Sequence, residues 1–107
     1  MKTLSSQDEI LLLAIIKLGI EAYGVTIRRY VSKVTAKEWS IGAIYDPLYR
    51  LEEKGMVQSF LSQPTQERGG RSKRMFKVTP EGRMALMEHK KVRDVLWGNL
   101  PEPVTNE

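Results

Sequence analysis

The chain has 107 residues, contains no cysteine and carries a formal net charge of +4. This length predicts one domain with a modest core, and the lack of cysteine excludes disulfides, thiolate metal sites and thiol nucleophiles. The longest apolar run, Ile10–Ile16, is far shorter than the roughly 20 residues that cross a membrane as a helix, and it lacks the flanking pattern of a signal peptide. We therefore expect a cytoplasmic protein that does not enter a membrane.

Three helices are predicted in the first half of the chain. Ser6 and Glu9 have the spacing of a capping box, and the apolar residues after them predict a buried helix that ends at Gly19. The second helix spans residues 23–34, and its apolar face consists of Ile27, Tyr30, Val31 and Val34. The third helix starts after the N-cap Ser40 and ends at Gly55, and its apolar stripe consists of Ile41, Ile44, Leu48 and Leu51.

Pro47 lies within the third predicted helix, where a proline removes a backbone donor and crowds the preceding turn. Asp46 and Pro47 would also make a good start for a separate helix. Because the apolar stripe stays in phase from Ile41 through Leu51, we predict one helix, which the proline could kink.

The second half of the chain predicts a hairpin followed by a last helix. Apolar and polar residues alternate in the runs 56–62 and 73–79, which flank a Gly-Gly turn. The candidates for the inner face of this hairpin are Met56, Phe60, Met75, Phe76 and Val78. Thr79 and Pro80 have the order of an N-cap and a first helical residue, so a helix is expected from Pro80 to about Gly98. Residues 101–107 are expected to form a disordered tail.

The hairpin tip holds the net charge of the chain. Between Gln66 and Val78 there are five basic residues and one acidic residue, whereas the rest of the chain has twelve of each. Cations so close together repel one another unless a polyanion binds them, so the tip predicts such a partner. The alternative is a loop that is merely solvated.

The order helix, helix, helix, hairpin, helix is that of a winged helix-turn-helix, whose third helix enters the major groove of DNA and whose hairpin reaches the flanking backbone. The predicted fold class is therefore mainly α, within α+β. Opposite its apolar stripe, the third helix presents Gly42, Ala43, Asp46, Tyr49, Arg50 and Glu53. The small residues allow phosphates to approach the helix N-terminus, and Arg50 can reach a phosphate or the O6/N7 edge of guanine.

Asp46 opposes this interpretation, because a carboxylate on a groove-facing surface repels phosphates. It could accept a hydrogen bond from cytosine N4, or it could hold Arg50 one turn away. The simpler alternative is a solvated helix face with an intrahelical ion pair.

Four stretches carry a more specific pattern. They are EAYG at 21–24, SIGAIYDPLYRLEEKGMV at 40–57, GGRSKRMFKVTPEG at 69–82 and the MALMEH stretch of the last helix. In these stretches the chain resembles the PadR family of bacterial transcriptional regulators. The resemblance implies a dimeric DNA-binding repressor of the short type, which has a single C-terminal dimerisation helix. In that family the tyrosine and proline of the third helix are usually adjacent, whereas here Asp46 stands between them, which leaves the base preference open.

The end of the last predicted helix supports a dimer independently. No later element remains to cover its apolar residues, which are Val92, Val95, Leu96, Trp97 and Leu100. Their burial would contribute about 7–15 kcal/mol against an association cost of roughly 4–15 kcal/mol. Because this helix alone is a marginal dimeriser, we expect the first helix of the partner to complete the interface through Leu11 and Ile15. The alternative is that these residues fold back on their own domain.

Some short members of the PadR family bind flat aromatic compounds between the dimer helices. By this resemblance, a similar surface could be supplied by Trp97, Met84, Met87 and Tyr23. An aromatic residue and methionines at helical spacing are, however, more often part of a core than of a pocket. Trp39 is interpreted as a core anchor.

The sequence does not indicate catalysis. His89 is the single histidine and has basic neighbours, so it is interpreted as packing between helices and not as a metal ligand. Gly69 and Gly70 are not followed by the lysine and serine of a phosphate-binding loop. No enzymatic activity, cofactor or metal is expected.

These features together predict a winged helix-turn-helix over residues 1–79 and a dimerisation helix over residues 80–100. The expected function is that of a homodimeric repressor on a palindromic operator in double-stranded DNA, with its third helices about one DNA turn apart. The expected DNA contacts are Arg28, Lys33, Ser40, Gly42, Tyr45, Tyr49, Arg50, Arg68, Arg71, Lys73 and Arg74. The alternatives are a module that docks an acidic protein partner and, third, a binder of structured RNA.

Overall fold

The computed structural model describes residues 3–63 and 72–103. Its elements in chain order are α1 (Ser6–Leu18), the 3-10 turn η1 (Gly19–Glu21), α2 (Gly24–Thr35), α3 (Ile41–Glu53), β1 (Val57–Leu61), β2 (Arg74–Val78) and α4 (Pro80–Trp97). This is a winged helix-turn-helix, so the predicted fold class is confirmed. The predicted Gly-Gly turn and the last part of the predicted tail lie outside the described residues.

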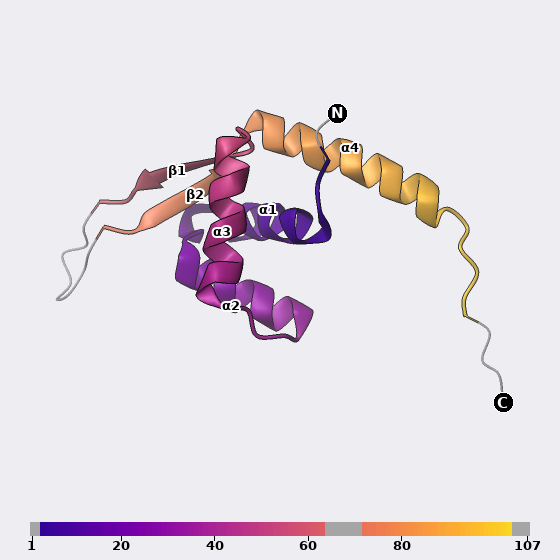
Figure 1. The fold of residues 1–107 in the computed structure, drawn as a ribbon, viewed down its shortest axis with the longest axis horizontal. Helices are drawn as coiled ribbons and strands as arrows, with labels where there is room; N and C mark the ends of the chain where they lie inside the picture. The colour runs from indigo at the N-terminus through magenta and orange to yellow at the C-terminus, as the bar shows by residue number, and fades with distance from the viewer. Residues whose placement is uncertain (1–2, 64–71, 104–107) are drawn as a thin grey trace.

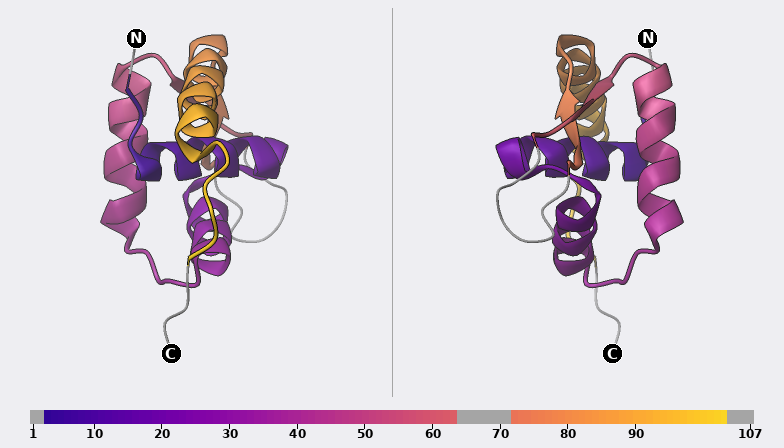
Figure 2. Two further views of the ribbon diagram at one scale, coloured as in Figure 1. Left: turned by 90° about the vertical axis from the view of Figure 1, so that its right-hand side faces the viewer. Right: turned by 90° about the vertical axis from the view of Figure 1, so that its left-hand side faces the viewer.

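The helices pack around α1, which crosses the centre of the domain and contacts α2, α3, α4 and β2 (Figure 1). The hairpin of β1 and β2 and the C-terminal end of α4 project from this body in opposite directions (Figure 1). Helix α3 lies at one side of the molecule, and no other described element covers its outer side (Figure 2). The fold thus leaves three features exposed: α3, the wing and the end of α4.

Helix α1 is buried on several sides, as its composition predicts. Its N-cap is Ser5, whose hydroxyl accepts a hydrogen bond from the Asp8 N–H at 3.0 Å, while the Asp8 carboxylate accepts one from the Ser5 N–H at 3.1 Å. The predicted capping box of Ser6 and Glu9 is therefore wrong by one residue, because the Ser5 and Asp8 pair offers the same reciprocal bonds. Glu9 is consequently available for a contact with α4.

The turn between α2 and α3 is fastened by Trp39, which is buried as predicted for a core anchor. Its indole Nε1 donates to the Thr35 hydroxyl at 2.9 Å, and its carbonyl accepts from Arg28 Nε at 2.6 Å. Pro47 lies inside an uninterrupted α3 and is buried, so the prediction of one helix is confirmed.

The predicted apolar faces of α2 and α3 are each one residue too long. Ile44, Leu48 and Leu51 are buried, but Ile41 is 60% exposed, and Val34 is exposed at the end of α2. Both lie at helix ends next to the turn, where the helices extend past the core that their middle residues contact. Periodicity identifies the side of a helix that faces the core but not how far the core extends along it.

The hairpin is antiparallel, with Val57 opposite Val78 and Phe60 opposite Met75. Four of the five candidates for its inner face are buried, namely Met56, Met75, Phe76 and Val78, whereas Phe60 is exposed. The prediction for Phe60 is wrong because the outer edge of β1 pairs with no further strand among the described residues, while β2 is bridged to Tyr23 at Met75, the residue opposite Phe60. Helix α4 follows β2 directly, and the Thr79 hydroxyl caps it by accepting from the Gly82 N–H at 3.1 Å.

Candidate nucleic-acid interface

The uncovered side of α3 carries small residues at its start and larger polar residues in its middle. Gly42, Tyr49 and Arg50 are all exposed on it. Ser40 caps the helix by accepting a hydrogen bond from the Ala43 N–H at 3.1 Å. The unpaired N–H groups at such a helix start attract phosphate, and an arginine one or two turns further on can reach a base edge. Four of the five contacts predicted for α3, namely Ser40, Gly42, Tyr49 and Arg50, are therefore exposed together.

Tyr45, the fifth predicted contact, lies closer to the core than the other four. Its ring is half-buried, with its centroid 5.9 Å from that of Tyr49 and 6.4 Å from that of Phe76. Its hydroxyl lies against Gly24, where an added Cβ would collide with it. Tyr45 therefore packs α3 against α2 and β2 and supports the ring of Tyr49, and its predicted contact with DNA stays a prediction.

Asp46 and Arg50 form no ion pair with each other. Neither side chain has a hydrogen bond or salt bridge within residues 3–63 and 72–103. The Asp46 carboxylate lies beside Gly42 instead, where an added Cβ would be 3.8 Å from Oδ2. This direction, towards the N-terminus of α3, is the one that the helix dipole favours for an anion. The intrahelical pair, one of the alternatives considered for Asp46, is thus absent from the structure, and the Arg50 guanidinium is available to a ligand.

The two predicted contacts on α2 differ in their surroundings. Arg28 is engaged with the Trp39 carbonyl, so its guanidinium holds the turn together. Lys33 is exposed. Beside them, α2 and the start of α3 border a hollow of about 400 Å³ lined in part by Val25, Arg29 and Ile41. The sequence places Arg29 on the basic outer face of α2 but does not single it out as a site residue, and it does not indicate that Val25 and Ile41 lie at this surface.

The base of the wing is tied to the helical domain by two of its predicted phosphate contacts. Lys73 Nζ donates to the Tyr23 hydroxyl at 3.2 Å and lies 4.3 Å from the centroid of that ring. Arg74 Nη1 donates to the Ser59 hydroxyl at 3.0 Å, and Ser59 donates to Glu52 Oε2 at 2.6 Å. The other two predicted wing contacts, Arg68 and Arg71, lie outside the described residues.

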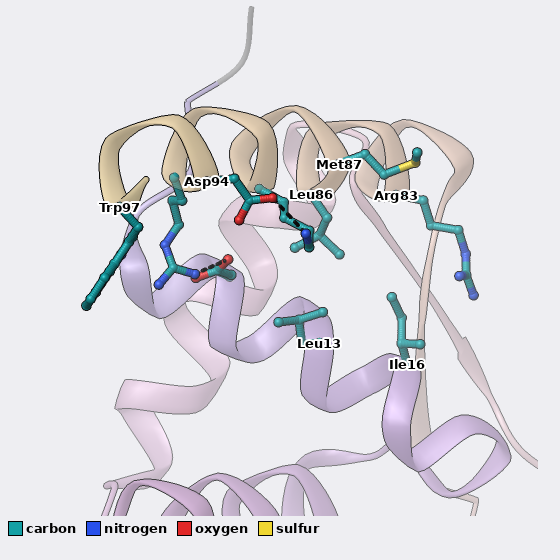
Figure 3. A pocket seen from close by; sticks show the side chains of 10 residues that line it. Leu13, Ile16, Arg83, Leu86, Met87, Asp94 and Trp97 are labelled. Carbon is teal, nitrogen blue, oxygen red and sulfur yellow. Dashed lines mark hydrogen bonds and ion pairs between the residues drawn. The ribbon is translucent and has the colours of Figure 1, made fainter. Parts of the chain in front are cut away.

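A groove of about 660 Å³ separates α1 from α4 (Figure 3). Its apolar lining is Leu13, Ile16, Leu86, Met87 and Trp97, with Arg83 and Trp97 at opposite ends (Figure 3). The two helices are joined across it by Arg93, whose Nη1 donates to both carboxylate oxygens of Glu9 at 2.9 and 3.0 Å. His89 lies between the same helices, with its Nε2 3.8 Å from Glu9 Oε1, as predicted for a packed histidine.

The apolar residues at the end of α4 do not fold back on the domain. These residues are 44 to 80% exposed. They are Val92, Val95, Leu96 and Trp97 within α4, and Leu100 just after it. Leu11 and Ile15, which were predicted to join them in a dimer interface, are 0% and 2% exposed in the core. That prediction is wrong because α1 crosses the domain centre and offers a partner only its groove side, where Leu13 is exposed.

The four residues predicted to form an aromatic-ligand surface are not brought together. Met87 and Trp97 line the groove, but Met84 does not. Tyr23 is engaged with Lys73 at the base of the wing. Of the predicted set, only Met87 and Trp97 lie together, with Leu13, Ile16 and Leu86 as their neighbours in the groove.

Neither a metal-binding cluster nor a membrane-spanning helix is present among the described residues. No three His, Asp or Glu side chains there are grouped so that they could hold a metal ion. None of the helices in the described ranges is long and apolar enough to span a membrane.

The exposed α3 with a basic wing beside it is the arrangement of a winged helix-turn-helix DNA-binding protein. Residues 12–88 match the model of the PadR-like family of transcriptional regulators. The chain belongs to this family, whose members regulate transcription and are not enzymes. The resemblance noted in the sequence is thereby confirmed.

Solved structures share the fold at low sequence identity. H. salinarum RosR is 21% identical with a TM-score of 0.69, and the match covers 91% of this chain and 80% of that one. A transcriptional regulator from Clostridium thermocellum is 21% identical with a TM-score of 0.66, over 94% of this chain and 100% of that one. A PadR-like transcription factor from Bacteroides fragilis is 22% identical with a TM-score of 0.67, over 88% and 89% of the two chains. Of the curated proteins, none matches this sequence significantly.

Proposed function

We propose that this protein is a cytoplasmic homodimeric repressor that binds a palindromic operator in double-stranded DNA. The observation that carries the proposal is the uncovered side of α3, where Ser40, Gly42, Tyr49 and Arg50 are exposed and Arg50 has no protein partner within the described ranges. Membership of a transcription-regulator family supports it. Base choice then rests on Tyr49, Arg50 and Asp46, while Lys33 and the wing cations Arg68 and Arg71 contact phosphates.

The proposed dimer forms through α4. Five large apolar side chains at its end are exposed, and the groove beside α1 adds the side chains of Leu13 and Met87. Exposed apolar side chains in such number are typical of an interface. A two-fold dimer would present two copies of α3, which matches a palindromic operator with half-sites about one DNA turn apart.

The test is fluorescence anisotropy with duplex DNA from upstream of the chain's own gene and with a scrambled duplex of equal length. We expect the wild type to prefer the upstream duplex and R50A to lose that preference, with a discrimination loss of about 1–3 kcal/mol. K91A, which removes a cation from the exposed side of α4, is the matched control and should bind as the wild type does. Binding of an acidic protein without binding of either duplex would instead support an interaction module.

A small aromatic effector, if one acts on this repressor, would bind in the groove beside Trp97 and Met87. Its apolar lining and its position next to the proposed dimer helix support this part of the proposal. In thermal-shift assays with a panel of planar aromatics, at least one compound should raise the melting temperature of the wild type, whereas none should raise that of W97A. A flat response of the wild type at millimolar ligand would refute it.

A further inference from the structure

Three side chains link the wing to α3. Glu52 lies in the last turn of α3, Ser59 lies on β1, and Arg74 lies on β2. Ser59 is opposite Phe76 and Arg74 is opposite Leu61, so Ser59 and Arg74 are diagonal neighbours on one face of the hairpin. The Ser59 hydroxyl donates to Glu52 Oε2 at 2.6 Å and accepts from Arg74 Nη1 at 3.0 Å. One hydroxyl can do both, since it has one donor and two acceptor sites.

The bond from Ser59 offsets an unfavourable position of the Glu52 carboxylate in α3. A carboxylate in the last turn of a helix is unfavourable, because the helix dipole is negative there. Glu52 is half-buried and lies on the turn after Leu48, whereas Glu53 beside it is exposed to solvent. The charge of Glu52 is therefore directed at the wing and not at the open side of α3.

Arg74 is an exposed cation on the wing, where a phosphate would be its natural partner. In the structure its guanidinium instead donates to a hydroxyl whose other partner is a carboxylate. We propose that Glu52 is a positioning residue that restrains Arg74 through Ser59, and so limits sequence-independent binding of duplex DNA. This inference rests on the proposed DNA-binding function.

The test is a cycle of wild type, E52Q, R74A and the double variant E52Q/R74A, with anisotropy on operator and scrambled duplexes at several salt concentrations. Removing the carboxylate should release Arg74 to a phosphate. We expect E52Q to tighten binding to the scrambled duplex by about three- to tenfold and to steepen its log-log salt slope by about 0.9 for each arginine released. The ratio of operator to scrambled affinity should fall accordingly.

The matched control is E53Q, which removes the same charge one residue away from a side chain that faces solvent. If E52Q tightened binding only because α3 lost a negative charge that repels DNA, E53Q would tighten binding equally. The effect of E52Q would then also persist in the R74A background. The effect of E52Q should vanish in that background. S59A removes the bridging hydroxyl without a change of charge and should shift the affinity ratio in the same direction as E52Q.

Thermal melts of each variant show whether it is folded at the temperature of the assay. The inference is overturned if E52Q weakens binding to both duplexes, if its effect survives in E52Q/R74A, or if S59A matches the wild type. Failure of the wild type to bind any duplex would refute the proposed function itself, which is a distinct result. If E52Q is unfolded, S59A replaces it in the cycle with R74A and S59A/R74A. The restraint then predicts that S59A tightens binding to the scrambled duplex only when Arg74 is present.

Discussion

Gly24 and Tyr45 are twenty-one positions apart in the chain, yet each determines what the other can be. The Tyr45 hydroxyl occupies the space in which a side chain at Gly24 would begin. The same ring stacks on Tyr49, which belongs to the uncovered side of α3. Packing at Gly24 therefore affects a candidate DNA contact that it does not touch.

The substitution G24A should destabilise the protein by about 1–3 kcal/mol, because the added methyl must displace Tyr45. The free energy of unfolding in urea measures this effect. G42A is the control, since its methyl would lie an ordinary 3.8 Å from the nearest atom, Asp46 Oδ2. It should leave stability unchanged or raise it by up to about 1 kcal/mol, and equal losses in the two variants would contradict the role given to Gly24.

The same control also separates stability from function. Gly42 lies at the start of α3, where we propose that DNA approaches closely. The protein itself leaves room for a side chain at position 42, so G42A should keep the unfolding free energy. It should weaken operator binding, because the added methyl would lie where the DNA is proposed to approach. Unchanged operator affinity would show that DNA does not approach this part of α3.

At the scale of elements, α4 divides into a half that is packed and a half that is not. Its first half contributes Ala85 and Leu86 to the buried set, and every residue from Lys90 to Trp97 is exposed. The Glu9–Arg93 pair holds the exposed half at its distance from α1. Since Arg93 is itself partly exposed, we assign this pair a role in orienting α4 and only a small one in stability.

The double variant V95E/L96E should be monomeric yet fully folded. Val95 and Leu96 are 80% and 75% exposed, so carboxylates there disturb no core contact, but a dimer would have to bury them as unpaired charges against a second apolar helix end. Sedimentation equilibrium gives the mass, and urea unfolding gives the stability of the domain. I20E is the control, because Ile20 is an apolar residue on η1 that is even more exposed, at 94%. A dimer that survives V95E/L96E would place the interface elsewhere.

The elements themselves could be predicted from the sequence because capping residues, glycines and apolar periods are local signals. The errors occur where a long-range contact decides. Phe60 fits the alternating pattern, but among the described residues only β2 has a further bridge partner, Tyr23. Leu11 and Ile15 read as surface on an all-round apolar helix, and only the crossing of α1 through the centre shows them to be core. The bonds of Lys73 and Arg74 were equally unpredictable, since they join residues as many as 50 positions apart.

At the scale of the whole molecule, the proposed DNA-binding features and the proposed dimer helix lie at different ends. The wing and the end of α4 extend in opposite directions, and α3 lies between them (Figure 1). Outside the hairpin segment, basic and acidic residues are equal in number, so long-range attraction to DNA must come mainly from the wing. The affinity of the molecule should therefore depend strongly on salt.

If six phosphates are neutralised per dimer, the log-log slope of operator affinity against salt should be about −5. The double variant R68A/R71A should make this slope shallower by about 3 to 4, because it removes two cations from each wing. Anisotropy titrations between low and moderate salt measure both slopes, with K91A as the unaffected comparison. A wild-type slope near zero would contradict the proposed role of the wing.

The proposed dimer contact at the exposed apolar end of α4 would link repression to the abundance of the protein. If only a pair of chains spans both half-sites, and single chains associate through this helix end, operator occupancy at low abundance rises with the square of the chain concentration. A twofold fall in synthesis would then lower occupancy about fourfold, so the regulated promoter would respond to dilution during cell growth more sharply than the affinity of one chain for DNA suggests.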